Sequence, residues 1–276
     1  MPEGPEIHRA ADTLARAVVG RELTGAYFAR PELKPYEEML KGCRVEAIDA
    51  RGKALVTRFA GDLCLYTHNQ LYGLWKVARS GARPQSKRSL RVALDTNHAS
   101  ILLYSASDVA IWPKDQIEQH PLLRQLGPDV LDPALTPQQV VERLQDRRFR
   151  GRQLASLLLD QRFLAGVGNY LRSEILFHAG LNAQQRPQDL TGDQLERLAS
   201  QAIEVSKRSY RSRGISPASG MRADYLDHSG GGFSFFVFDR AGEACLRCDS
   251  IIERAEIGGR RCYRCPQCQP AGGKST

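Results

Sequence analysis

The hydrophobic pattern changes along the chain, and each change predicts a different kind of structure. Over residues 5–19, apolar side chains recur at helical spacing, with Pro5 suited to the first turn and Gly20 to the stop. From about residue 22 to 112, short runs of branched and aromatic residues alternate with glycines, which is typical of strands joined by turns. The clearest runs are residues 23–28, 55–59, 63–67, 90–94 and 101–104. A helix followed by a β-sandwich or a related all-β module is therefore expected.

Helical spacing returns over residues 136–209. Thr136 is a suitable N-cap for a first helix, and Thr191 with Gln194 forms a capping box for the last one. Between them, the apolar spacing predicts one helix over residues 153–160 and another over residues 169–179.

The remainder of the chain changes character again. Residues 210–232 are rich in Ser, Gly and Arg and lack periodicity, which indicates a loop, whereas residues 233–238 resume as a predicted strand. We therefore predict an α+β multidomain protein. Its expected parts are an N-terminal domain (1–129), a hinge (130–135), a helical domain with the loop (136–232), a cysteine-rich domain (233–270) and a tail (271–276).

Charge indicates the class of partner. Lys and Arg outnumber Asp and Glu by 39 to 31, a formal net charge of +8, and the arginines gather in three short stretches. Such an excess favours a polyanion as partner, although each stretch could also be an ordinary solvated face. No run is long and apolar enough for a membrane span, and the N-terminus lacks the apolar stretch of a signal peptide, so a cytoplasmic, nucleoid-associated protein is expected.

Four of the seven cysteines have the spacing of a metal site. Cys245-x-x-Cys248 and Cys265-x-x-Cys268 resemble the two knuckles of a zinc ribbon, whose four thiolates make a closed, structural site for one Zn²⁺. Cys262 forms a second CxxC with Cys265, but the proline after Cys265 favours the knuckle, so Cys262 is left out. Iron–sulfur ligation remains an alternative.

The N-terminus carries the most specific candidate chemistry. If Met1 is removed, Pro2 exposes a secondary amine whose pKa, ~7.7–8.0 for a free α-amino group, leaves much of it neutral and nucleophilic. The neighbouring Glu3 supplies a carboxyl group for proton transfer. The alternative is that Pro2 is incidental and Pro5 merely opens a helix.

Three further stretches have candidate roles in binding. Gly166 and Gly168 precede a predicted helix start at Asn169, an arrangement that lets backbone N–H groups approach a phosphate. Lys53 follows a glycine at a strand start. Residues 68–72 mix polar amides with Leu71 and Tyr72, which suits a wedge that fills a gap in a nucleic-acid helix, although packing in the core is the default expectation for both.

Taken together, these motifs resemble the formamidopyrimidine-DNA glycosylase/endonuclease VIII family, and its endonuclease VIII branch in particular. The resemblance runs in order along nearly the whole chain. The matching segments are residues 2–7, 51–55, 68–73, 104–108, 127–131, 166–170 and the Cys-x-x-Cys ribbon. It implies an N-terminal β-sandwich, a helix–two-turn–helix domain and a C-terminal zinc ribbon. It also implies a monomeric DNA glycosylase/lyase that excises oxidised pyrimidines, and cleaves abasic sites, in double-stranded DNA.

The family's functional residues map onto individual positions. By resemblance, Pro2 is the Schiff-base nucleophile, Glu3 the proton donor, Lys53 the β-elimination lysine and Arg260 the δ-elimination arginine of the zinc finger. The positions expected to contact DNA are Gln70, Leu71, Tyr72, Arg124, Gly168 and Asn169.

Two positions depart from the family pattern. The family has an arginine where this chain has Gln125, and the neighbouring Arg124 is the candidate substitute. After Arg260, the usual Pro-Phe is replaced by Arg261 and Cys262.

Two other classes compete with this interpretation. A DNA-binding protein without catalysis would explain the ribbon and the charge, but not why Pro2 and Glu3 accompany Lys53. A tautomerase using an N-terminal proline as base would explain Pro2, but such chains are short and have no ribbon.

Overall fold

A computed structural model describes residues 2–212 and 234–270, and the predicted loop over residues 210–232 falls almost wholly outside them. By their contacts the residues form two compact units. The first comprises Pro2 and residues 6–125, and the second comprises residues 3–5 together with the chain from Leu126 onward. The predicted hinge, residues 130–135, falls inside the second unit, and its role as a hinge stays a prediction.

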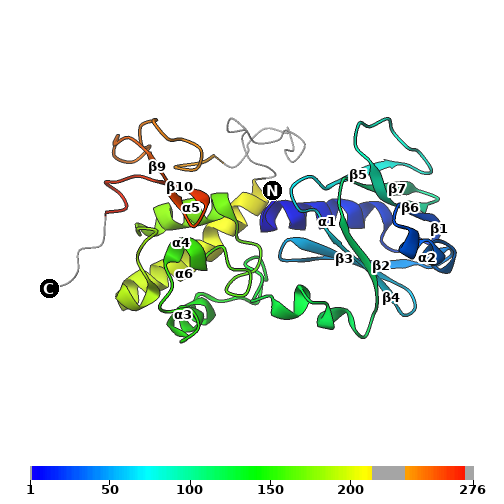
Figure 1. The fold of residues 1–276 in the computed structure, drawn as a ribbon, viewed down its shortest axis with the longest axis horizontal. Coiled ribbons are helices and arrows are strands. Elements are labelled where there is room, and N and C mark those ends of the chain that lie inside the picture. Colours follow the sequence, from blue (N-terminus) through cyan, green and yellow to red (C-terminus); the bar gives the residue numbers. More distant parts are fainter. Residues whose placement is uncertain (1, 213–233, 271–276) are drawn as a thin grey trace. The chain divides into compact units, whose positions relative to one another are not determined.

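The first unit is a β-sandwich, as predicted. One antiparallel sheet has the order β1-β6-β7-β5 and the other β2-β3-β4-β8 (Figure 1). The bounds of the first sheet are β1 Leu23–Phe28, β6 Leu90–Thr96, β7 Ala99–Tyr104 and β5 Leu74–Arg79. Those of the second are β2 Val45–Arg51, β3 Ala54–Phe59, β4 Leu63–His68 and β8 Asp108–Pro113.

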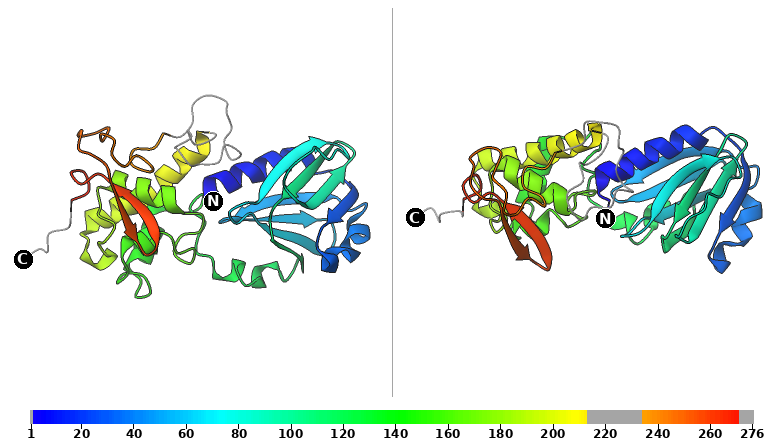
Figure 2. Two further views of the ribbon diagram at one scale, coloured as in Figure 1. Left: turned by 45° about the horizontal axis from the view of Figure 1, so that its top comes forward. Right: turned by 90° about the horizontal axis from the view of Figure 1, so that it is seen from above.

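Both sheets and a helix contribute to one core. Figure 2 shows the sheets of this unit facing each other, and inward side chains such as Phe28, Phe59 and Leu65 are fully buried between them. Helix α1, Gly4–Val18, adds its apolar stripe of Ile7 and Leu14 to the same core. The strands β2, β5 and β8 are not among the clearest runs of the sequence. They are edge strands of the two sheets, and their polar, half-exposed residues interrupt the hydrophobic pattern.

The second unit is mainly helical. Its helices are α3 Pro137–Gln145, α4 Leu154–Leu157, α5 Asn169–Ala179 and α6 Gly192–Arg211. A short α2, Pro35–Leu40, lies in the first unit, and four single turns of 3-10 helix cover Pro31–Leu33, Ile117–Gln119, Leu123–Gln125 and Pro187–Asp189. Both predicted caps are confirmed, because Thr136 and Thr191 each form a complete capping box. The helix predicted over residues 153–160 is shorter than expected.

One predicted element is wrong. Residues 234–238 form no strand, because the backbone N–H groups of Phe236, Val237 and Phe238 donate to the carboxylate of Glu174 at 2.9–3.0 Å instead of to a neighbouring strand. After this turn, a hairpin of β9 Glu253–Ile257 and β10 Arg260–Arg264 forms between the two cysteine pairs.

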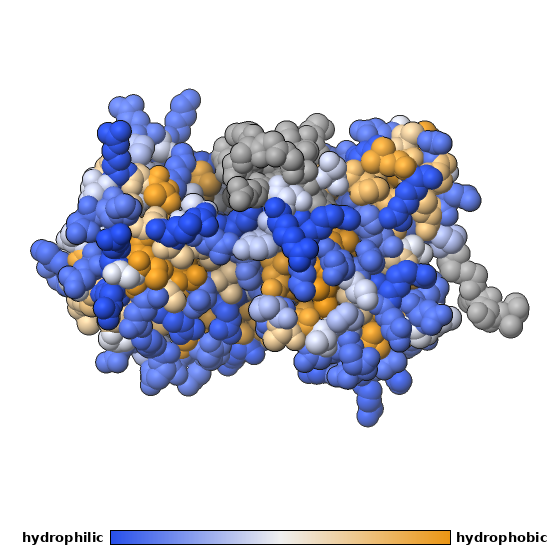
Figure 3. Space-filling model, turned by 180° about the vertical axis from the view of Figure 1, so that it is seen from behind, coloured by the Kyte–Doolittle hydropathy of each residue, from blue (hydrophilic) through white to orange (hydrophobic). Residues whose placement is uncertain are grey.

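The surface is consistent with the charge of the chain. On the face drawn in Figure 3, hydrophilic side chains predominate, with smaller hydrophobic areas between them. No helix among the described residues is both long and apolar enough to cross a membrane.

Candidate functional site

Glu3 acts as the N-terminal cap of helix α5, although the two are far apart in the chain. Its carboxylate accepts N–H groups from Tyr170 at 2.8 Å and Leu171 at 3.2 Å, the second and third positions of the helix. These donors have no partner within a helix and favour an anion. Glu3 is only 4% exposed, so its position is fixed by buried hydrogen bonds.

The glycines predicted to approach a phosphate also make room for this segment. A Cβ on Gly168 would lie 2.3 Å from Cδ of Glu3, and one on Gly4 would lie 3.1 Å from the backbone of Gly166. The N–H of Gly4 donates to the carbonyl of Gly166 at 2.8 Å. Gly166 itself has φ of 94°, a conformation that favours glycine. The Gly-x-Gly pair is therefore needed for docking residues 3–4 against the start of α5.

Asn169, the first residue of α5, is held with its amide group ready to donate. The guanidinium of Arg172 donates to its side-chain oxygen at 2.8 Å, and because a guanidinium only donates, the amide N–H₂ is left for another partner. Arg172 is fully buried and also donates to the carbonyls of Ala155 and Arg261. It thus connects α5 to the hairpin that carries Arg260.

Arg260 lies directly after the tight turn of the β9–β10 hairpin. Ile257 and Arg260 are paired across the hairpin, and Gly258 and Gly259 between them have φ of 61° and 70°. Two consecutive positive φ values define the turn that joins twisted strands most easily, and they require residues such as glycine. Arg260 is exposed at this tip.

Lys53 lies in the first unit, in the turn between β2 and β3. Gly52 before it has φ of 63°, and Ala54 after it is paired with His68 on β4. Burial first, and the charge of Lys53 in addition, lower the pKa of His68, whereas Asp108 opposes them. Lys53 therefore acts electrostatically on the residue that begins the predicted wedge.

The predicted wedge is exposed, which overturns the default expectation of core packing. Leu71 is 48% and Tyr72 61% exposed. Gln70 has a positive φ of 51° and is held by the hydroxyl of Ser107, which donates to its side-chain oxygen at 2.7 Å. Gly73 closes the turn, since a Cβ there would lie 2.5 Å from the carbonyl oxygen of Asn69. The turn thus leaves two large apolar side chains exposed.

Arg124 is exposed in a turn of 3-10 helix, Leu123–Gln125, of the first unit. The neighbouring Gln125 donates its side-chain amide to the carbonyl of Pro121 at 2.7 Å, a local contact. Whether Arg124 takes the place of the family arginine stays a prediction.

The four predicted cysteines form one cluster. The sulfur atoms of Cys245, Cys248, Cys265 and Cys268 all lie within 4.8 Å of one another. Three of the separations are 3.4, 3.5 and 3.9 Å, close to the ~3.8 Å between sulfurs placed tetrahedrally 2.3 Å from a central ion. Backbone N–H groups of Arg247 and Cys268 donate to the sulfurs of Cys245 and Cys265, as expected of two knuckles. The residues present fit a metal ion of tetrahedral preference.

Cys262 is not part of this cluster. It is 4% exposed and belongs to the hydrophobic core of the second unit, and burial raises the pKa of its thiol. Among the described residues, the cysteine cluster that could hold a metal ion therefore comprises the four predicted cysteines, and Cys262 contributes to packing.

Two buried charged residues were missed by sequence reasoning. Arg172 and Glu174 are both fully buried in α5 and bind the backbone of the hairpin and of residues 236–238. Burial raises the pKa of Glu174, against three backbone N–H donors. The available signal was the presence of two charges in a helix whose polar residues do not gather on one face.

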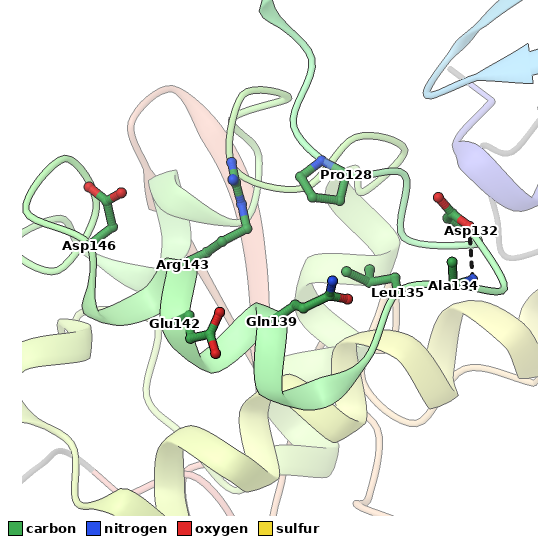
Figure 4. Close-up of a pocket in the computed structure, with 8 residues that line it drawn as sticks. All are labelled: Pro128, Asp132, Ala134, Leu135, Gln139, Glu142, Arg143 and Asp146. Carbon is green, nitrogen blue, oxygen red and sulfur yellow. Dashed lines mark hydrogen bonds between the residues drawn. The ribbon is translucent and has the colours of Figure 1, made fainter.

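The described chain also contains a cavity of about 460 Å³ beside α3 (Figure 4). Its lining residues are Pro128, Asp132, Ala134, Leu135, Gln139, Glu142, Arg143 and Asp146. Arg143 donates to the backbone carbonyls of Arg162 and Phe163. None of the predicted site residues lines this cavity, so it is not the candidate site.

Two family models identify the class of protein as DNA glycosylases. The N-terminal domain of formamidopyrimidine-DNA glycosylase matches residues 1–107, and the helix–two-turn–helix domain of the same family matches residues 126–218. The chain belongs to the formamidopyrimidine-DNA glycosylase family. Within it, the chain is 52% identical over 269 residues to Endonuclease 8 of Escherichia coli and equally to that of Pectobacterium carotovorum, covering 98% of this chain and 100% of each relative.

Solved structures share the fold. A complex of Lactococcus lactis Fpg with DNA containing an abasic site has a TM-score of 0.82 at 21% identity, and covers 98% of this chain and 100% of that one. A complex of the same enzyme with DNA containing an oxidised pyrimidine has a TM-score of 0.82 at 22% identity, with the same coverage. A small tautomerase, the alternative suggested by Pro2 alone, does not have this two-unit fold.

Proposed function

We propose that the chain acts as a DNA glycosylase with lyase activity at abasic sites in base-excision repair, and that it removes oxidised pyrimidines from duplex DNA. Family membership and the full-length similarity to Endonuclease 8 support the class of activity. The observation that supports the mechanism is the buried cap, because Glu3, the residue that follows Pro2 in the chain, is held at the start of α5.

The proposed reaction begins when the lesion-bearing nucleotide leaves the stack, which costs least for a poorly stacked base. Leu71 and Tyr72 fill the space in the helix. Once Met1 has been removed, the nitrogen of Pro2 attacks C1′. The glycosidic bond breaks, the base takes its electron pair and a proton, and an iminium ion links Pro2 to the sugar. Glu3 delivers protons during opening of the sugar ring.

The iminium ion then acts as an electron sink for strand cleavage. Loss of a proton from C2′ expels the 3′ phosphate by β-elimination, and a second proton loss expels the 5′ phosphate by δ-elimination. Lys53 assists the first step and Arg260 the second. Hydrolysis of the Schiff base returns the Pro2 amine and leaves a one-nucleotide gap with phosphates at both ends.

The remaining predicted residues hold the DNA. Asn169 offers its amide N–H₂, and Gly168 its backbone, to a phosphate, while Gln70 and Arg124 contact the duplex from the first unit. We also propose that the four cysteines hold one Zn²⁺, which supplies fixed tetrahedral geometry to the hairpin that carries Arg260 and takes no part in the chemistry. A cytoplasmic monomer associated with the nucleoid fits this role.

Two paired assays test this function. A preparation whose N-terminus is extended, so that the Pro2 nitrogen is an amide, is compared with the trimmed protein for nicking of a thymine-glycol duplex and for binding to it. We expect nicking to be abolished and binding to be retained, because acylation removes only the nucleophile. Equal nicking by both preparations would favour chemistry without Pro2, whereas binding without nicking by the trimmed protein as well would favour a DNA-binding protein without this catalysis.

A further inference from the structure

The side-chain amide of Gln70, the residue before the exposed Leu71 and Tyr72, is held by a residue from another part of the first unit. The hydroxyl of Ser107 donates to its oxygen at 2.7 Å, across 37 residues of sequence. Gln70 follows β4, whereas Ser107 lies between β7 and β8. The amide oxygen is therefore engaged as an acceptor, and within residues 2–212 and 234–270 the amide N–H₂ has no partner.

The turn itself is closed by other hydrogen bonds. The backbone N–H of Gln70 donates to Nδ1 of His68 at 3.0 Å, and that of Gly73 donates to the carbonyl of Asn69 at 2.7 Å. These two contacts fix the backbone on either side of the exposed residues. The contact from Ser107 acts only on the end of the Gln70 side chain.

The backbone around Ser107 is also well defined. Its carbonyl accepts from Nη1 of Arg30 at 3.3 Å, and the same nitrogen donates to the carbonyl of Val109 at 3.3 Å. Two residues earlier, Ser105 has φ of 55°, and its N–H donates to the carbonyl of Ser89 at 2.8 Å. A positive φ outside glycine persists only where the surrounding structure determines it. The hydroxyl of Ser107 is thus presented from a fixed position.

A contribution to stability is the alternative reason for this contact. Both Ser107 and Gln70 are exposed, however, so water competes for the same donor and acceptor, and the net gain is small. The larger effect is on orientation. The last torsion of a glutamine side chain is broad and roughly two-fold, so an unrestrained amide presents its oxygen about as easily as its N–H₂ group. The hydroxyl donor selects one of these two states.

We propose that Ser107 is a positioning residue that holds the Gln70 amide as a hydrogen-bond donor for an acceptor atom of the DNA. This inference rests on the proposed function, in which residues 70–72 enter the helix. The acceptor is an oxygen or nitrogen of a base edge, or an oxygen of the sugar–phosphate backbone. An amide that is oriented before binding loses less conformational freedom when the contact forms.

Excision of thymine glycol from a duplex by the full-length, zinc-loaded protein tests this role. We expect kcat/KM to fall about tenfold in Ser107→Ala, since the amide is no longer oriented. Ser107→Thr keeps the hydroxyl and should restore most of the activity. Ser80→Ala removes a hydroxyl that donates to the carbonyl of Thr96 in the same unit, and it should behave as the wild type. All of these proteins should process a single-stranded substrate at the wild-type rate.

A double-mutant cycle shows whether Ser107 acts through Gln70. If it does, Ser107→Ala causes no further loss once Gln70→Ala is present. Gln70→Glu keeps an oxygen that accepts from Ser107 but lacks the N–H₂ group, so it should lose as much activity as Gln70→Ala. The proposal is overturned if Ser107→Ala excises from a duplex at the wild-type rate, or if its loss adds fully to that of Gln70→Ala.

The source of the acceptor is decided by a duplex that carries a stable residue without a base opposite thymine glycol. If the acceptor belongs to the opposite base, Ser107→Ala and the wild type excise from this duplex equally. If the acceptor belongs to the backbone, the tenfold difference remains. Failure of the proposed function would look different, because the wild type itself would then excise thymine glycol from neither duplex nor single strand.

Discussion

At the residue scale, Gly168 shows how closely the proposed proton donor is fitted. A methyl group there would overlap the Glu3 carboxylate, so Gly168→Ala must displace Glu3 from its two N–H donors. We expect overpacking to cost roughly 1–3 kcal/mol of stability. Base excision should fall by about 10²–10⁴-fold, the range associated with general acid–base catalysis.

The matched control is Gly192→Ala. Gly192 also begins a helix, α6, but a Cβ there meets no atom within 4 Å. Stability by thermal unfolding and excision of thymine glycol should both be unchanged in this variant. Full activity of Gly168→Ala would contradict the assigned role of Glu3.

The exposed wedge allows activity to be separated from stability. Because Leu71 and Tyr72 are largely exposed, changing both to Ala should alter the free energy of unfolding by only about 0.5 kcal/mol. Excision from a duplex should nonetheless fall, since nothing then fills the helix. Buried Leu65→Ala, by contrast, should cost ~2–5 kcal/mol.

A single-stranded substrate supplies the control for the wedge variant, because there is no base pair to replace. We expect both proteins to process it at the same rate. Equal rates on duplex substrate as well would show that the wedge has no role in exposing the lesion.

At the element scale, the hairpin of β9 and β10 depends on attachments at both ends. The cysteine cluster fixes its flanks, while Arg172 binds its backbone at Arg261 and orients Asn169 on α5. Arg260 is therefore positioned by residues that are not its neighbours in the sequence. Loss of either attachment should disturb the phosphate contacts proposed for Arg260 and Asn169.

Metal content tests the assignment of the cysteines. Cys268→Ser should lower bound zinc from one ion per chain toward none and weaken DNA binding, because a structural site contributes directly to folding. Cys262→Ser should keep one zinc ion and lose about 1–3 kcal/mol of stability through a buried hydroxyl. Zinc released by thiol modification measures the metal content of each variant, and thermal unfolding measures its stability. Loss of metal from Cys262→Ser would place Cys262 among the ligands, and visible absorbance would instead favour an iron–sulfur centre.

At the scale of the whole molecule, the sequence correctly predicted the features that depend on a few neighbouring residues. The N-cap at Thr136, the capping box at Thr191, the α1 stripe and the knuckle spacing are each contained within a few residues, and all are confirmed. The family resemblance added Lys53 and Arg260, which local chemistry alone does not single out.

The rest was missed because the partners lie far apart in the chain. Phe236–Phe238 has the composition of a strand, yet its N–H groups bind Glu174 on α5. Likewise, nothing near Gly168 in sequence indicates that Glu3 will occupy the space of its side chain. Burial and the positions of edge strands depend on the assembled fold, so periodicity could not supply them.

The most direct test is borohydride reduction of the protein with DNA containing an abasic site, followed by mass spectrometry of the N-terminal peptide. Reduction converts an iminium ion into a stable amine, so the account predicts a covalent DNA adduct located on Pro2. No adduct should form when the Pro2 nitrogen is acylated. An adduct on a lysine such as Lys53, or strand cleavage at full rate with the Pro2 nitrogen blocked, would contradict it.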